Sequence, residues 1–400
     1  MTQAPEPDSA PGTEPVNEPD RVPGAPHPRE TVELFGQAAA EAAFLAAKTA
    51  GRLHHAWLLT GPRGIGKATL AWRIARHLIA DAGAGPGLFD PAEAAATLSM
   101  PPDHPVFRRC AALSDPRLAL VRRGHDERTG RLRGEITVAE IRNLRGALQL
   151  SAPDGGWRAV IIDAADEMNG AAANALLKFL EEPPAQVVFV LVSHQPARLL
   201  PTIRSRCRAL RLHPLAAEAM GAALTQAGAH LAAGEHTALA SLAEGSVGDA
   251  LRLADAGGAE LYAQLVGLLA GLPVLDRRAL TGFAESLGGR GTEARRETAE
   301  RLVALALGRL ARAAATGRLP GTAAPGEAAA GATGEAAPGE AALAARFQAQ
   351  PAGARMLAEA AQRSPARLAQ ARAVNLDPAQ AMLDTLLELE QTARQLLPTA

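Results

Sequence analysis

Cysteine is scarce in this sequence, and its scarcity excludes two architectures. Cys110 and Cys207 are the only cysteines among 400 residues. The chain can therefore build neither a disulfide framework nor a four-cysteine metal site. Long apolar runs are also missing, and the N-terminus lacks the basic and apolar segments of a secretion signal. We therefore expect a protein of the reducing cytoplasm.

Net charge is equally small. The 41 Lys and Arg nearly balance the 42 Asp and Glu, which gives a formal net charge of −1. No global field draws such a chain onto nucleic acid, so contact with DNA would come from a local patch or through partners. Among the basic residues only Lys48, Lys67 and Lys178 are lysines, which makes each lysine position informative.

Apolar residues are plentiful, at 48%, and the length suits about two or three domains. Proline, glycine and acids dominate residues 1–28, which predicts a disordered tail. Residues 29–213 alternate strand and helix patterns, which predicts an α/β domain whose parallel sheet is covered by helices on both faces. Beyond it we expect only helices: a small domain at 214–256 and a second at 257–400, with a flexible low-complexity insert at about 313–341.

The α/β region contains several clear local patterns. Strand patterns cover 54–60, 158–163 and 187–192, and helix patterns cover 68–81, 138–150 and 169–182. Thr137 and Glu140 form a capping box that should start one of these helices. Between Gly83 and Gly134 the pattern is too loose to predict any element.

The strongest chemical signal is a glycine-rich turn between a strand and a helix. It reads Gly61-Pro62-Arg63-Gly64-Ile65-Gly66-Lys67. Glycines let the backbone N–H groups curl around a phosphate, the following helix adds its dipole, and a lysine reaches the outer phosphates. The turn therefore predicts a P-loop that binds nucleotide, either ATP or ADP.

This P-loop is degenerate. Ala68 stands where Ser or Thr would bind Mg²⁺, and Thr69 comes one residue late. One residue on a helix is a rotation of about 100°, so Thr69 should not face the same metal. Asp163 ends a buried strand, as the Mg²⁺-binding aspartate of P-loop ATPases does, but Ala164 follows it where a Glu would activate water. We expect Mg²⁺ only together with nucleotide.

Two further motifs resemble a known family. One is Ser205-Arg206-Cys207, which follows a buried strand, and the other is Asn174-Ala175-Leu176-Leu177-Lys178-Phe179-Leu180-Glu181-Glu182-Pro183-Pro184. Together they resemble the AAA+ subunits of bacterial clamp loaders, and the resemblance covers residues 53–212 well. Residues 163–169 and 375–378 point to one subunit type within this family, and residues 245–250 extend the resemblance into the small helical domain.

The resemblance implies roles for particular positions. Arg206 would be an arginine finger that acts in trans, on the nucleotide of a neighbouring subunit, where its fork neutralises charge on the γ-phosphoryl group. Hydrolysing relatives carry a nucleotide-sensing arginine where this chain has Gly248. Relatives also carry four zinc-binding cysteines where this chain has only Cys110, so we expect no zinc. His104, His125 and His194 lack metal-ligand spacing, and we assign them no role.

The resemblance also implies a function. The chain would be a subunit of a hetero-pentameric ring with gamma/tau and delta subunits, part of the DNA polymerase III holoenzyme without catalytic activity of its own. That ring loads the sliding clamp at primer–template DNA during replication. One alternative is an active ATPase motor subunit of the same loader. Another is a kinase-like P-loop enzyme with the 313–341 insert as a lid, although the all-helical domains argue against it.

Overall fold

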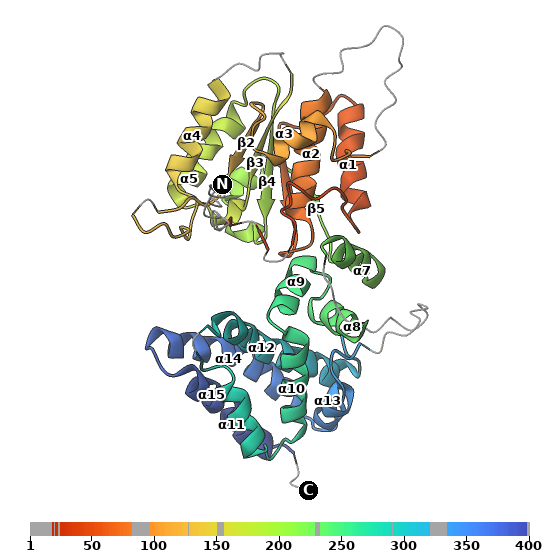
Figure 1. Cartoon of the computed structure of the whole chain (residues 1–400), viewed down its shortest axis with the longest axis vertical. Helices are drawn as coiled ribbons and strands as arrows, with labels where there is room; N and C mark the ends of the chain where they lie inside the picture. The colour runs from red at the N-terminus through yellow and green to blue at the C-terminus, as the bar shows by residue number, and fades with distance from the viewer. Residues whose placement is uncertain are drawn as a thin grey trace, which may run out of the picture.

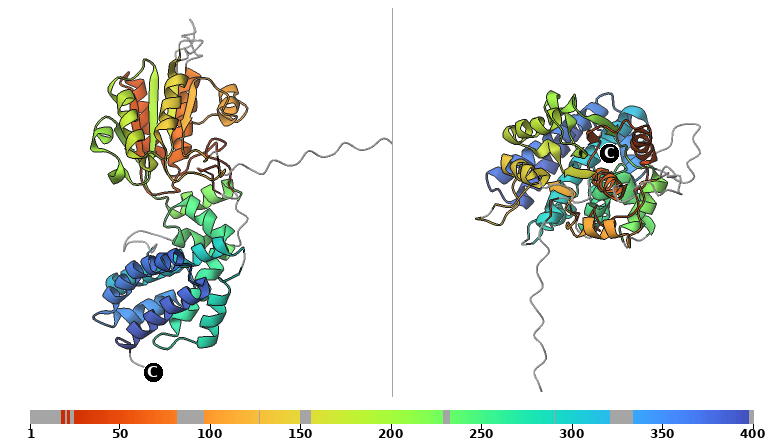
Figure 2. Two further views of the ribbon diagram at one scale, coloured as in Figure 1. Left: turned by 90° about the vertical axis from the view of Figure 1, so that its left-hand side faces the viewer. Right: turned by 90° about the horizontal axis from the view of Figure 1, so that it is seen from above.

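The structure is a computed structural model of the whole chain. It describes residues 18–397 apart from 20, 23–24, 82–96, 127, 150–155, 229–232, 290 and 321–333. Figures 1 and 2 show an α/β part at one end of the molecule, a group of short helices in the middle and a bundle of longer helices at the other end.

The α/β part is built on a five-stranded sheet. Its strands are β1 (Ala56–Thr60), β2 (Leu118–Val121), β3 (Arg158–Ile162), β4 (Val187–Ser193) and β5 (Arg208–Arg211). The spatial order is β2-β3-β4-β1-β5, and every neighbouring pair is parallel. The carboxyl ends of β1, β3 and β4 therefore meet at the same edge of the sheet.

Helices cover both faces of this sheet (Figure 1). On one face lie α1 (Ala38–Thr49), α2 (Lys67–Asp81) and α3 (Pro105–Ala111), and on the other lie α4 (Val138–Gln149) and α5 (Gly170–Glu181). Successive residues of β1 alternate between the two cores, with Trp57 in the first and Leu58 in the second, as strand geometry requires. The predicted fold class, an α/β domain with a parallel sheet between two helical layers, is confirmed.

Short elements complete this part of the chain. They are the 3₁₀ turns η1 (Ala165–Glu167) and η2 (Pro196–Arg198) and the single-turn helix α6 (Pro201–Arg204). At the start of α4 one half of the predicted capping box forms, in which the Thr137 N–H donates to Glu140 Oε2 at 2.8 Å. Thr137 Oγ1 accepts from the N–H of Ala139 at 3.3 Å.

In the part of the chain that the structure describes, only helices follow β5. The central group is α7 (Ala217–Gln226), α8 (Ala233–Leu242) and α9 (Val247–Asp255). The distal bundle is α10 (Gly258–Ala270), α11 (Arg277–Glu285), α12 (Glu293–Thr316), α13 (Glu340–Gln348), α14 (Gly353–Ala373) and α15 (Pro378–Arg394). The view in Figure 2 shows the bundle farthest from the sheet.

The prediction of a flexible insert at about 313–341 is wrong at both ends. α12 continues to Thr316, and α13 begins at Glu340. Arg309 and Glu340 are fully buried, and Arg309 Nε donates to Glu340 Oε1 at 2.7 Å. The alanine-rich sequence at these ends was interpreted as low complexity. Alanine, however, has the highest helix propensity of all residues. The remaining part of the predicted insert, 321–333, lies outside the described residues.

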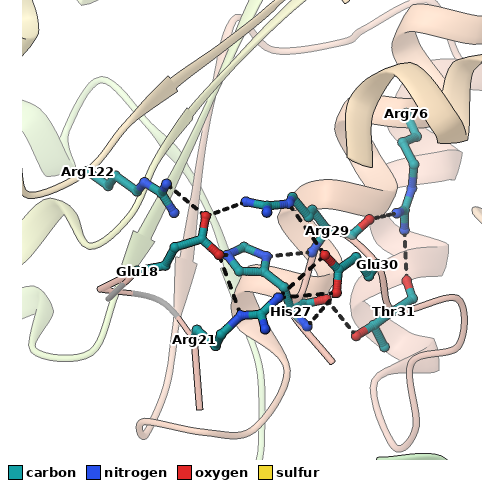
Figure 3. A network of polar contacts seen from close by, with 8 residues as sticks. All are labelled: Glu18, Arg21, His27, Arg29, Glu30, Thr31, Arg76 and Arg122. Carbon is teal, nitrogen blue, oxygen red and sulfur yellow. Dashed lines mark hydrogen bonds and ion pairs between the residues drawn. The ribbon is translucent and has the colours of Figure 1, made fainter. Parts of the chain in front are cut away.

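The prediction of a disordered tail over residues 1–28 is wrong at its C-terminal end. Residues 1–17 lie outside the described residues. His27, however, is fully buried, with its ring 6.4 Å from that of Trp72 in an edge-on arrangement. Glu18 accepts hydrogen bonds from Arg29 Nη1 at 2.6 Å and from Arg122 Nη2 at 3.0 Å (Figure 3). The composition of residues 1–28 did not predict this packing, because the partners Trp72 and Arg122 lie far along the chain. We call the described residues of 18–28 the N-terminal strap.

Candidate nucleotide-binding site

The P-loop lies between β1 and α2, at the carboxyl edge of the sheet. Gly61, Gly64 and Gly66 have φ values of +141°, +77° and +97°, which glycine adopts far more readily than other residues. A Cβ atom at Gly61 would lie only 2.6 Å from the carbonyl oxygen of Leu212. The backbone path itself therefore requires these glycines.

Lys67 is the buried cation of this loop. Its side chain is 3% exposed, and Nζ donates to the carbonyl oxygen of Gly61 at 2.8 Å and also to that of Pro62. Burial lowers the pKa of Lys67 to about 8, while the charges of Asp163 and Asp166 act in the opposite direction. A phosphate in the loop would oppose the effect of burial as well, because it favours the charged amine.

A cavity of about 220 Å³ opens beside the P-loop. Its polar wall contains residues 63–69 of the loop together with Asp163, Glu167, His194 and Arg252. Its apolar wall comes from the strap, the segment after it and the central helices: Val22, Ala25, Leu34, Phe35, Leu215, Ala223 and Leu251. A cavity that combines a glycine-rich loop and cationic side chains with apolar lining residues suits the phosphates and the base of a nucleotide.

The structure brings the predicted Asp163 to this cavity, beside the loop. Asp163 is 8% exposed, and the neighbouring Ala164 also borders the cavity. Two carboxylates follow. Asp166 accepts from the backbone N–H groups of His194 and Gln195 at 2.9 and 3.1 Å. Glu167 is held by two arginines: Arg63 Nη2 lies 2.9 Å from Oε1, and Arg123 Nε lies 2.8 Å from Oε2. Ala164 therefore leaves the position after the aspartate without a group that could activate water.

His194, to which the sequence analysis assigned no role, also lines the cavity. Its backbone N–H donates to Asp166 Oδ1 at 2.9 Å, and its Nδ1 is buried without a hydrogen-bond partner among the described residues. Burial lowers its pKa to about 4, helped by the charges of Lys67 and Arg63. The signal was available, because His194 follows β4 and ligands of parallel sheets bind at the carboxyl ends of the strands.

The start of α9 rests directly on the P-loop. The Gly248 N–H donates to the carbonyl oxygen of Gly64 at 3.0 Å, and Ser246 Oγ donates to that of Arg63 at 2.9 Å. A Cβ atom at Gly248 would lie 3.0 Å from the Cα of Gly64. An arginine at position 248 would therefore require α9 to move away from the loop. Arg252, one helical turn later, borders the cavity instead.

Arg206 lies at the opposite edge of the sheet from the P-loop. β5 runs parallel to β1, with Arg208 beside Trp57 and Arg211 beside Thr60. This paired segment spans about 10 Å at roughly 3.3 Å per residue. Arg206 precedes its amino end, whereas the P-loop follows its carboxyl end. The side chain cannot reach its own nucleotide cavity.

The Arg206 guanidinium is nevertheless accessible. Its side chain is 36% exposed and lies 3.0 Å from Glu181 through Nη2, while Nη1 donates to the carbonyl oxygen of Thr202 at 3.0 Å. Burial inside its own fold would have removed the candidate arginine finger, and Arg206 is not buried.

The described residues contain no cluster of three or more His, Cys, Asp or Glu side chains that could hold a metal ion. Cys110 is buried in the core, and burial raises its pKa to about 12. The absence of zinc stays a prediction. None of the helices described is both long and apolar enough to cross a bilayer.

Comparison with known proteins gives a consistent result. Residues 36–216 match the family model described as DNA polymerase III, delta subunit. DNA polymerase III subunit delta' of Pseudomonas aeruginosa is 39% identical over 153 residues, which are 38% of this chain and 41% of that protein. Subunit delta' of Escherichia coli is 32% identical over 211 residues, or 52% of this chain and 57% of that one.

A second kind of subunit matches as well. Subunit gamma/tau of Mycobacterium tuberculosis is 31% identical over 179 residues, which are 45% of this chain and 28% of that protein. The chain thus spans between 28% and 57% of the length of these relatives. Over part of its length, this chain is therefore similar to DNA polymerase III subunits delta' and gamma/tau.

Proposed function

We propose that this chain is the delta-prime subunit of a bacterial DNA polymerase III clamp loader, which loads the sliding clamp onto primed DNA during replication. The position of Arg206 carries this proposal. Its guanidinium is accessible, but it lies at the edge of the sheet opposite its own P-loop. An arginine finger so placed would serve the nucleotide of a neighbouring subunit, where it stabilises charge on the transferred phosphoryl group.

The same proposal holds that this subunit does not hydrolyse ATP. Three positions support it. Ala68 offers no hydroxyl to Mg²⁺, Ala164 offers no base for water, and Gly248 offers no sensing cation. The cavity retains the loop and Lys67, so it would bind ATP or ADP, with Mg²⁺ only in company of the nucleotide.

The proposed partners are the gamma/tau and delta subunits of a hetero-pentameric ring in the cytoplasm. Contact with the sliding clamp and with primer–template DNA would come through this complex. Residues 29–213 would be the AAA+ domain, 214–256 the small helical domain and 257–400 the domain that joins the helical collar of the ring. The distal position of α10–α15 in Figure 2 supports that last assignment, because it leaves the α/β part free to face its neighbours.

The substitution Arg206→Ala tests the proposal in a loader reconstituted from all its subunits. Arginine fingers contribute about 10³ to 10⁵ in rate at the site they serve. Clamp loading should therefore fall by about tenfold or more, since a loader with one impaired site among several retains part of its activity. The matched control is Arg204→Ala, which removes an exposed arginine two residues away. Unchanged clamp loading and DNA-stimulated ATPase with Arg206→Ala would refute the proposed role.

The gamma/tau relative, at 31% identity, favours one alternative: an active ATPase motor subunit. The purified chain alone, incubated with Mg²⁺ and ATP, separates the two functions. Turnover that Lys67→Ala abolishes would support the motor, because that lysine contacts the β- and γ-phosphates of P-loop enzymes. Absence of turnover supports the delta-prime assignment. The kinase-like alternative has less support, because only helices follow β5 in the described residues.

A further inference from the structure

We propose that Glu181 is a positioning residue for Arg206. This inference rests on the proposed function, in which Arg206 acts on a neighbouring subunit. Glu181 is the last residue of α5, and its Oε1 lies 3.0 Å from Arg206 Nη2. The carboxylate and the guanidinium come from segments that both precede a strand of the parallel sheet, β4 and β5. Both groups therefore lie at the amino edge of the sheet, remote from the P-loop.

The contact is selective among the arginines of this edge. Arg204, Arg206, Arg208 and Arg211 all lie within or beside α6 and β5. In the described parts of the chain, Arg206 alone of these four has a carboxylate within ion-pair distance. Arg208 stacks instead on the ring of Trp57, with 5.0 Å between Cζ and the ring centroid. A merely solvated arginine-rich surface would not single out the residue of the Ser-Arg-Cys motif.

Two contacts restrain the guanidinium and leave some of its N–H donors free. Nη1 donates to the carbonyl oxygen of Thr202 at 3.0 Å, and Nη2 faces Glu181. A guanidinium has five N–H donors in a fixed planar fork, so most of them stay available for phosphate oxygens. The side chain of Arg206 keeps 36% of its surface exposed. Both terminal nitrogens are thus held in place, while part of the guanidinium stays accessible.

Such restraint matters because an exposed arginine samples many rotamers. Ordering a long side chain at the moment of reaction opposes the transition state, whereas a side chain already held in place avoids that cost. Both members of this pair are well exposed, so the effect is modest. Surface ion pairs of this kind shift an equilibrium by up to about fivefold. We expect Glu181 to act on the rate of the neighbouring site rather than on its affinity for ATP.

The chain supplies its own matched control. Glu182 follows Glu181, is exposed, and forms no ion pair among the described residues. Glu181→Gln and Glu182→Gln remove the same charge one residue apart. In the complete reconstituted loader, Glu181→Gln should lower the kcat of DNA-stimulated ATP hydrolysis about twofold to fivefold, with KM for ATP unchanged. Glu182→Gln should leave both constants at their wild-type values.

A double-mutant cycle separates positioning from a structural role. In an Arg206→Ala background, Glu181→Gln should have no further effect, because the side chain it positions is gone. Four results would overturn the inference: a Glu181→Gln loader that behaves like the Glu182→Gln loader, a rise in kcat, a change in KM alone, or an equal loss in the Arg206→Ala background. If Arg206→Ala itself changes nothing, the proposed function fails. If it impairs the loader while Glu181→Gln does not, only the positioning role fails.

Discussion

At the scale of single residues, two glycines determine how closely α9 approaches the P-loop. Gly64 and Gly248 meet backbone to backbone, with a hydrogen bond of 3.0 Å between the Gly248 N–H and the Gly64 carbonyl oxygen. A Cβ at Gly64 would come within 2.3 Å of Ser246 Oγ. Close approach of this kind is possible only without side chains. The start of α9 therefore packs on the P-loop backbone to backbone.

This contact predicts the effect of placing an arginine at position 248. Gly248→Arg should destabilise the fold by about 1–3 kcal/mol, as overpacking of a tight contact does. The control is Gly267→Arg on α10, where a Cβ meets nothing within 4 Å. That change should be neutral or slightly stabilising, because arginine is a better helix former than glycine. Urea unfolding of both variants measures the difference. Equal stability of wild type and Gly248→Arg would contradict the close contact.

The sequence predicted those site residues that belong to a single short motif. The glycines and Lys67 stand in one turn, and Asp163 ends one apolar strand, so each could be recognised within a few residues. Arg252 could not, because its position depends on the docking of α9. His194 could have been recognised from the sequence, because it follows an apolar strand. The lack of metal-ligand spacing argues only against His194 as a metal ligand. Its place after a central strand was the informative feature.

At the scale of elements, the sequence predicted long and strongly patterned segments and missed short ones. The helices that became α2, α4 and α5 were anticipated to within a residue or two. β2 was missed because its four residues are mostly half-buried and pair on one side only, with β3. Four residues are too few to show a strand period. The N-terminal strap was missed because ion pairs with distant arginines, rather than apolar periodicity, hold it in place.

The strap yields a prediction that depends on pH. Glu18 is partly buried, which raises its pKa, but hydrogen bonds from Arg29 and Arg122 outweigh burial, and the pKa lies below its ordinary value of 4.5. A carboxylate with a lowered pKa stabilises the fold above its unfolded pKa, and that stability is lost as the pH falls through the folded value. Glu18→Gln should therefore destabilise the fold at pH 7 by about 1–3 kcal/mol, because the hydrogen bonds from its arginine partners lose the carboxylate charge.

Thermal unfolding at several pH values tests this element directly. The difference in stability between wild type and Glu18→Gln should persist from pH 7 to about pH 5. It should shrink below the ordinary pKa of 4.5. Glu33→Gln is the control, since Glu33 is exposed in the following segment and forms no ion pair among the described residues. A difference that stays constant down to pH 3, or that Glu33→Gln reproduces, would show that the Glu18 carboxylate does not hold the strap.

At the scale of the whole molecule, one buried cluster joins the central helices to the distal bundle. Arg309 of α12 forms its centre. It donates to Glu340 of α13 through Nε at 2.7 Å and to the carbonyl oxygen of Ser241 in α8 through Nη1 at 3.1 Å. The Tyr262 hydroxyl of α10 donates to the same Glu340 carboxylate at 2.6 Å. Four helices therefore meet at a single fully buried ion pair.

This pair makes the last prediction. Glu340→Gln would leave the buried Arg309 charge without its counter-ion, and breaking a buried pair from one side destabilises a protein by about 3–5 kcal/mol. The midpoint of urea unfolding should fall accordingly. Glu359→Gln, which breaks the exposed pair between Arg355 and Glu359 on α14, should change the free energy of unfolding by no more than about 0.5 kcal/mol. Equal stabilities of the two variants would mean that Arg309 does not need Glu340. The contact between α12 and α13 would then not depend on this ion pair.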